Sequence, residues 1–109
     1  MQNHPENALC NMNLGNAYSG KSEYNKAIEA YNKTIKIYEN NNMQNHPDYA
    51  LCNMNLGVAY TDMGRKEEAI MHIELALNIF EKSVGKNHPY YQKCLNNLNR
   101  CFINEKKSV

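Results

Sequence analysis

The stretch MQNHPENALCNMNLGNAY at residues 1–18 returns at residues 43–60 as MQNHPDYALCNMNLGVAY, with 15 of the 18 positions identical. A weaker third copy, KNHPYYQKCLNNLNRCF, begins at Lys86. The histidines at His4, His46 and His88 fix the period at 42 residues. An internal period of roughly 20 to 50 residues is typical of solenoids, whose units bury their apolar faces by stacking on their neighbours. The repeat therefore predicts the architecture first, and it favours binding over chemistry as the function.

Each copy opens with His-Pro, a dipeptide that suits the start of a helix. Proline is tolerated at the first helical position because its missing N–H would have no partner there. The apolar residues that follow recur at the helical spacing. We therefore expect helices over residues 5–19, 23–39, 47–62 and 66–82, with Ser22 capping the second, Gly64 ending the third, and a last helix beginning at Pro89.

The first helix of each unit carries apolar residues on two sides. One stripe is expected to face the second helix of the same unit, and it comprises Leu14, Gly15, Ala17 and Tyr18 with their copies Leu56, Gly57, Ala59 and Tyr60. A second stripe, formed by Leu9, Met12, Leu51, Met54 and Val58, does not fit that side. Glycine inside a helix costs about 0.5–1 kcal/mol relative to alanine, so its return at Gly15 and Gly57 predicts close helix packing.

Length and composition limit the function. A chain of 109 residues is expected to form one small domain, and its net charge of +1 gives no electrostatic footprint for nucleic acid. No apolar run approaches the ~18 residues of a membrane span and no signal peptide is present, so we expect no membrane partner and a cytoplasmic location. We interpret all four cysteines, Cys10, Cys52, Cys94 and Cys101, as small buried residues in a reducing compartment.

Catalytic and metal-binding patterns are not found. The histidines at the helix starts would lie about 10 Å apart, too far to share a metal ion. Apart from Glu68 and Glu74, His72 has no cysteine or carboxylate nearby at a metal spacing, and we interpret it as a surface residue. No phosphate-binding loop or nucleophile elbow occurs. We therefore expect no enzyme, no cofactor and no metal site.

A recurring signature connects the two complete units to a known family. It comprises Leu14, Gly15, Tyr18, Ala27, Tyr31 and Thr34 in the first unit, and Leu56, Gly57, Tyr60, Ala69, Ile73 and Ala76 in the second. This signature resembles the tetratricopeptide repeat (TPR). The 42-residue period, the His-Pro at helix entry and the asparagines before the leucine, namely Asn13, Asn55 and Asn97, are similar to the kinesin light chain branch.

The resemblance implies an all-α fold, an α-α superhelix of five helices in about two and a half helix-turn-helix repeats. The first repeat would span residues 1–42, the second 43–84, and a C-terminal capping helix 85–109. That last helix ends in a polar tail, Arg100, Asn104, Glu105, Lys106 and Lys107, as a solubilising cap would.

The resemblance also implies a concave groove lined by the first helix of each unit, which would hold a protein or peptide partner. The expected groove residues are Leu9, Met12, Asn13, Asn16, Leu51, Met54, Asn55, Val58, Asp62, Lys93, Asn96, Asn97 and Arg100. Methionine side chains adapt to apolar anchors, and asparagine amides both donate to and accept from a peptide backbone. By resemblance, Lys93 and Arg100 would meet acidic residues that flank an aromatic one in the peptide.

Two alternatives accompany this interpretation. Asn16, Asn55 and Lys93 stand at three of the five places of a carboxylate clamp that some TPR proteins use for acidic tails, but Met12 and Asn97 replace two of its cations. Alternatively, the chain is an assembly element that self-associates through the apolar groove or through the open ends of the solenoid.

Overall fold

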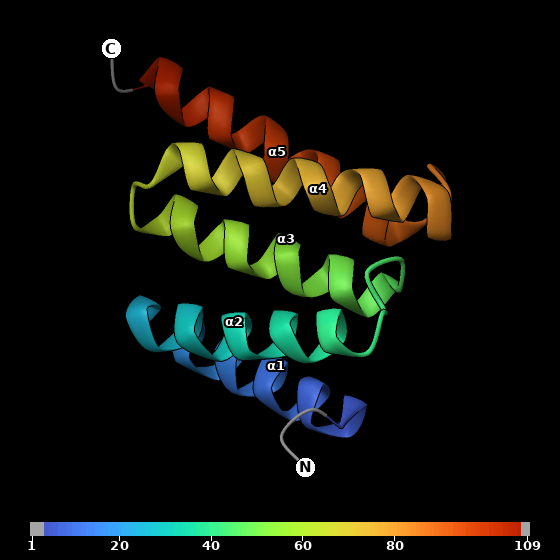
Figure 1. Cartoon of the computed structure of the whole chain (residues 1–109). Helices are drawn as coiled ribbons and strands as arrows, with labels where there is room; N and C mark the ends of the chain where they lie inside the picture. Colours follow the sequence, from blue (N-terminus) through green and yellow to red (C-terminus); the bar gives the residue numbers. More distant parts are fainter. Residues whose placement is uncertain (1–3, 108–109) are drawn as a thin grey trace.

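Five helices make up the fold of the computed structural model, which describes residues 4–107, with the side chains described up to residue 103. They are α1 (Pro5–Gly20), α2 (Tyr24–Asn40), α3 (Pro47–Asp62), α4 (Lys66–Ser83) and α5 (Pro89–Lys107). No strand occurs between residues 4 and 107. The helices follow one another as antiparallel hairpins along one direction, from α1 at one end to α5 at the other (Figure 1). The predicted all-α architecture is confirmed, and the helix ends lie within one residue of the predicted ones.

The histidine of each His-Pro pair caps a helix with its side chain. His4 Nδ1 accepts from the backbone N–H of Glu6 at 3.2 Å, His46 Nδ1 from that of Asp48 at 3.0 Å, and His88 Nδ1 from that of Tyr90 at 3.0 Å. The first N–H groups of a helix have no partner inside it, so a side-chain acceptor at this place stabilises the start. Histidine therefore recurs with proline because the two residues act together at the helix start. The histidine accepts a hydrogen bond from a backbone N–H of the first turn, and the proline occupies the first helical position, where an N–H would have no partner.

The turn within each unit passes through a left-handed residue at the same repeat position. Ser22 has φ of 63° and Gly64 has φ of 81°. The residue preceding α2 is Glu23, which makes no side-chain capping bond. The expectation that Ser22 caps this helix is therefore wrong, because Ser22 is the turn residue itself. Glycine adopts this backbone conformation without steric cost, whereas serine does not.

Close packing within each unit is confirmed at the two helical glycines. A Cβ on Gly15 would lie 2.6 Å from Cε1 of Tyr31, and one on Gly57 would lie 2.5 Å from Cγ1 of Ile73. Thr34 Oγ1 also donates to the carbonyl oxygen of Ala8 at 3.2 Å and so links α2 to α1. The two helices of a unit thus approach too closely for a larger side chain at the glycine positions.

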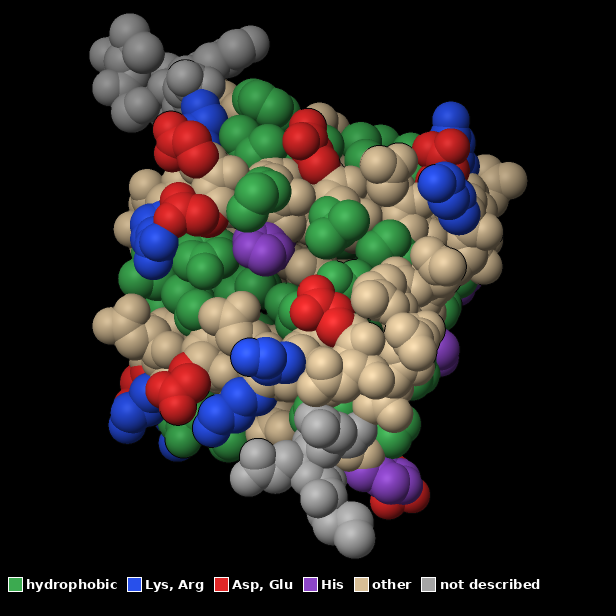
Figure 2. Space-filling model, viewed as in Figure 1, with side chains coloured by type: hydrophobic (Ala, Val, Ile, Leu, Met, Phe, Trp, Pro, Cys, Tyr) green, Lys and Arg blue, Asp and Glu red, His purple; other side chains and the backbone are tan. Residues whose placement is uncertain are grey.

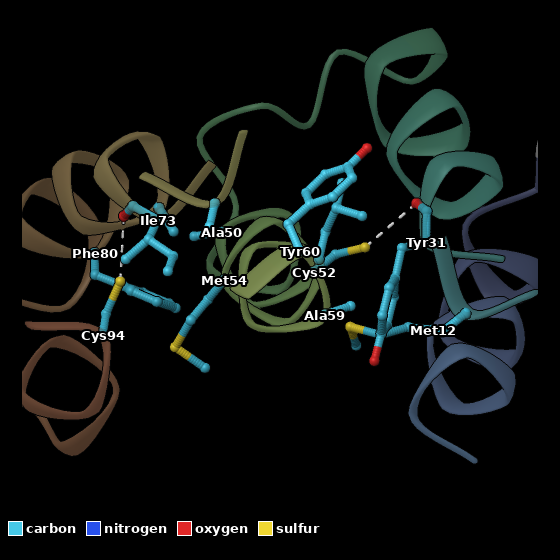
Figure 3. Packing of buried hydrophobic residues seen from close by; sticks show 14 of the residues in the cluster. Met12, Tyr31, Ala50, Cys52, Met54, Ala59, Tyr60, Ile73, Phe80 and Cys94 are labelled. Atoms are coloured by element: carbon cyan, nitrogen blue, oxygen red, sulfur yellow. Dashed lines mark hydrogen bonds between the residues drawn. The ribbon is translucent and has the colours of Figure 1, made fainter. Parts of the chain in front are cut away.

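The contact between neighbouring units also recurs at the same repeat positions. Cys52 Sγ on α3 donates to the carbonyl oxygen of Tyr31 on α2 at 3.5 Å, and Cys94 Sγ on α5 donates to that of Ile73 on α4 at 3.4 Å (Figure 3). Burial raises the pKa of both thiols to about 12. Cys10 is exposed, so the expectation that all four cysteines are buried is wrong at this position. The reason is that its copies are covered by the preceding unit.

Two residues of the first apolar stripe also differ in burial between the two units. Leu14 is 47% exposed and Ala17 is exposed, whereas their copies Leu56 and Ala59 are fully buried. The expectation that Leu14 and Ala17 face α2 is therefore wrong. This side of the helix is the one that a preceding unit covers in α3.

The first helices of the units lie in one row. α1 contacts α3, and α3 contacts α5, whereas α2 and α4 do not contact each other within residues 4–107. The row of α1, α3 and α5 therefore forms the more closely spaced, inner side of the array, and α2 and α4 form the outer side. α5 exposes Phe102 and Ile103, so its described part is not wholly polar, and the polar tail expected at residues 104–107 lies outside the described side chains.

Candidate protein-binding surface

Most of the residues expected to line a groove are accessible on the row formed by α1, α3 and α5. The exposed ones are Leu9, Asn13, Asn16, Asp62, Lys93, Asn96 and Arg100, and the half-buried ones are Leu51, Asn55, Val58 and Asn97. Eleven of the thirteen expected side chains are therefore at least partly accessible. We call this set of eleven residues the inner surface.

The two methionines do not belong to the inner surface. Met12 is 3% exposed and Met54 is fully buried, and both lie in the main hydrophobic core. Figure 3 shows Met54 extending from α3 toward the side where Cys94 of α5 lies. The expectation that Met12 and Met54 face a partner is therefore wrong. Their position falls where each first helix meets the next one in the row, so the following unit buries it.

An amide pair joins the first two units on the inner surface. Asn55 Nδ2 donates to Asn16 Oδ1 at 3.2 Å, and the hydroxyl of Tyr31 donates to the same oxygen at 2.5 Å. Burial raises the pKa of the Tyr31 hydroxyl, which keeps it a neutral donor. Because two donors fix Asn16 Oδ1, the Nδ2 groups of Asn16 and Asn55 are held in defined directions.

A pocket of about 190 Å³ lies beside this amide pair. Its lining residues are Asn16, Ser19, Gly20, Tyr31, Asn55 and Val58, which come from α1, α2 and α3. The pocket is shallow and mixed in character, with amide groups next to the methyl groups of Val58. It is wide enough for one side chain of a bound peptide, and the neighbouring amides could bond to the peptide backbone.

The α5 end of the inner surface is positively charged. Lys93 and Arg100 are both exposed, and Arg100 Nη1 donates to Asn97 Oδ1 at 3.5 Å. Asp62 on α3 is exposed and contributes an opposite charge at the end of its helix. Cations at one end can attract acidic groups there, whereas the pocket between α1 and α3 is lined by no charged residue.

A buried polar pair in the second unit escapes prediction from the sequence. Asn53 is 1% exposed, and its Nδ2 donates to the carbonyl oxygen of Tyr49 at 3.1 Å. Its Oδ1 is then free to accept from His72 Nδ1, 2.9 Å away, and His72 stacks on Tyr60 with ring centroids 5.7 Å apart. Burial lowers the pKa of His72. His72 is therefore half-buried, and its interpretation as a surface residue is wrong.

No group of three or more histidine, cysteine or acidic residues within the described part of the chain is placed to hold a metal ion. Among the helices as far as they are described, none is long and apolar enough to cross a membrane.

Comparison with known families identifies the class of protein. The tetratricopeptide repeat family matches residues 8–41 and again residues 50–90, which together make up more than half of the chain. The chain therefore belongs to the tetratricopeptide repeat family, as the signature predicts. Repeats of this family generally serve as scaffolds for protein–protein interaction. No curated protein matches the chain.

Solved structures share the fold of the chain. The chain is similar to BtubC (BKLC) from P. vanneervenii, with a TM-score of 0.88 and 21% identity over 94% of this chain and 41% of that one. It is also similar to a putative kinesin light chain with nearly identical TPR-like repeats from P. anserina, with a TM-score of 0.75 and 21% identity over 98% of this chain and 51% of that one. The chain thus spans about half or less of these proteins, and at this identity the likeness is one of fold.

Proposed function

We propose that the chain is a noncatalytic protein-interaction module that holds an extended peptide on the inner surface. The observation that carries the proposal is the Asn16–Asn55 amide pair beside a pocket formed by both units. A peptide laid across the row would bond its backbone to these amides and insert one side chain beside Val58.

The charge distribution supports a direction for the peptide. Lys93 and Arg100 stand on α5, so acidic residues of the peptide are expected at that end, and the pocket side chain at the α1–α3 end. Because Met12 and Met54 are buried, the apolar contribution from the chain is smaller than a methionine-rich groove would give. Binding is therefore expected to depend on hydrogen bonds and charge, and to weaken as the salt concentration rises.

A peptide-display selection on the wild-type chain tests the proposal. The groove variant combines Asn55→Ala and Arg100→Ala, which removes one amide and one cation from the inner surface. The matched control combines Asn32→Ala and Lys33→Ala on α2, which also removes one amide and one cation, from an exposed site on the outer side. Each lost hydrogen bond is worth about 0.5–3 kcal/mol, so the groove variant should bind the selected peptides at least about tenfold more weakly.

The control variant should keep the wild-type affinity for the same peptides. Selected peptides should share a motif with acidic residues on one side of a larger side chain. Equal binding by the wild-type chain and the groove variant would contradict the proposal. Light scattering over a concentration series tests the assembly alternative, which predicts that the mass rises with concentration. A chain that stays monomeric at every concentration would rule out that alternative.

A further inference from the structure

The pocket between α1 and α3 contains one of the few positions at which the two copies of the repeated stretch differ. Only three of the 18 residues change between the copies, where Glu6, Asn7 and Asn16 are replaced by Asp48, Tyr49 and Val58. Of the three positions in α1, only that of Asn16 lines the pocket. The amide at this position is therefore a property of the first unit and not of the repeat.

The residues that line the pocket have counterparts 42 residues later, where α3 contacts α5. In the order Asn16, Ser19, Gly20, Tyr31, Asn55 and Val58, the counterparts are Val58, Thr61, Asp62, Ile73, Asn97 and Arg100. Aliphatic residues replace both Asn16 and Tyr31, so the bonds that fix the amide pair are not available at the second contact. There Asn97 Oδ1 accepts from Arg100 Nη1 instead, at 3.5 Å. Two units therefore pack together without the amide pair, and its presence in the pocket is not required by the fold.

The hydrogen bonds within the amide pair leave one donor group and one acceptor available. Asn16 Oδ1 accepts from the hydroxyl of Tyr31 and from Asn55 Nδ2, which together use both of its lone pairs. Among the side chains that the structure describes, none bonds to Asn16 Nδ2 or to Asn55 Oδ1. Asn16 is exposed and Asn55 is half-buried, so both groups can be reached from outside. The pocket thus offers N–H groups and a carbonyl oxygen from two neighbouring side chains.

We propose that this pocket selects a primary amide side chain of the bound peptide, glutamine or asparagine, and that Asn16 determines the selection. The inference rests on the proposed function and adds the identity of one peptide side chain to it. The oxygen of the peptide amide accepts from Asn16 Nδ2, and its nitrogen donates to Asn55 Oδ1. The methylene groups of the same side chain contact Val58.

Other side chains are less complementary to the pocket. A carboxylate has only acceptors and an ammonium group has only donors, so neither can bond to both Asn16 Nδ2 and Asn55 Oδ1. Each of them would also lose part of its hydration in a pocket that is lined by no charged residue. An aliphatic side chain would contact Val58, but it would separate the two amide groups from water without bonding to them.

The probe is a display library of random peptides, selected separately on the wild-type chain and on the variant Asn16→Val. The variant gives α1 the residue that α3 has at the copied position, and circular dichroism checks that it folds. Asn16→Ala, which favours the helix more strongly than valine does, repeats the comparison. The peptide position whose preferred residue differs between the wild-type chain and these variants is the pocket position. The matched control Asn32→Val makes the same change at an exposed asparagine of α2.

Glutamine or asparagine should be enriched at the pocket position on the wild-type chain, and an aliphatic residue should replace it on Asn16→Val. One selected peptide is then made again with glutamate, and again with leucine, in place of the amide residue. The wild-type chain should bind both altered peptides at least about tenfold more weakly, because each loses a hydrogen bond to the amide pair. Asn16→Val should bind the leucine peptide at least as tightly as the original one, whereas Asn32→Val should keep the wild-type preference.

The outcomes distinguish this inference from the proposed function. A motif that depends on the residues changed in the groove variant, but whose pocket position prefers an acidic or aliphatic residue on the wild-type chain, would overturn the inference alone. Identical preferences of the wild-type chain and Asn16→Val at every peptide position would also overturn it, because Asn16 would then not determine the selection. Peptides that bind equally to the wild-type chain and the groove variant would contradict the proposed function and this inference together.

Discussion

The first helices of the two complete units, α1 and α3, are nearly the same sequence in two different surroundings. Leu14 and Cys10 are exposed in α1, whereas their copies Leu56 and Cys52 are fully buried in α3. Of these two helices, only α3 has another unit packed on that side within the described residues. The comparison shows that burial in a repeat array is a property of the neighbours and not of the residue.

The second helices differ in the opposite way, because here the surroundings are alike and the residues change. Glu29 and Lys33 form an exposed ion pair on α2, and the same positions on α4 are Met71 and Leu75, which are 59% and 42% exposed. Figure 2 shows hydrophobic side chains gathered over α4 and charged side chains over α2. The outer side of the array therefore tolerates either kind of residue, because packing between the helices does not depend on it.

The largest expected effect comes from truncating the same leucine in both units. Leu56→Ala should lower the free energy of unfolding by about 2–5 kcal/mol, because it leaves a cavity in the core. Leu14→Ala should cost less than about 1 kcal/mol, because nearly half of that side chain is already in water. Urea unfolding followed by circular dichroism measures both. Equal losses of stability in the two variants would show that the difference in burial between Leu14 and Leu56 does not affect their contributions to stability.

The cysteines at the same repeat position, Cys10 and Cys52, should differ in how they affect the pH dependence of the free energy of unfolding. Burial raises the pKa of Cys52 to about 12, so the folded chain keeps a thiol that the unfolded chain ionises above its usual pKa near 9. The stabilisation from Cys52 is therefore complete below about pH 9 and is lost toward pH 12, by up to about 1.4 kcal/mol per pH unit.

Urea unfolding of variants between about pH 8 and pH 11 measures this loss. Cys52→Ala should lose less stability over that range than the wild-type chain does. Cys10→Ala is the matched control, and it should follow the wild-type slope because it leaves the buried Cys52 thiol in place. Identical slopes for all three proteins would mean that ionisation of the Cys52 thiol does not lower the free energy of unfolding.

The smallest effect is expected on the outer side. Replacing Met71→Glu and Leu75→Lys together gives α4 the charges that α2 has, and it should change the free energy of unfolding by no more than about 0.5 kcal/mol. The same urea experiment measures it. A loss above about 2 kcal/mol would mean that the two residues carry packing that their exposure conceals.

Most of the residues that the sequence assigns to a groove are accessible in the structure, and the two that are buried, Met12 and Met54, are buried for one reason. The helical period places Leu9, Met12 and Asn16 together on one broad side of α1. It does not say which of them the next unit covers, and the structure buries Met12 while it leaves Leu9 and Asn16 exposed. The same limit explains Asn53, a polar residue on a buried side that becomes acceptable only because Tyr49 and His72 satisfy its amide.

The sequence by itself determined the helices, their ends, the 42-residue period and the family, because these depend on interactions within a few residues and on a signature carried by every unit. Only the tertiary structure decided which apolar residues are covered. The sequence assigned Leu56 to the side facing the second helix of its own unit and Met54 to the groove, and both are fully buried in the array. The physical reason is that periodicity fixes which residues share a face of a helix, whereas the packing of neighbouring units fixes which faces leave water.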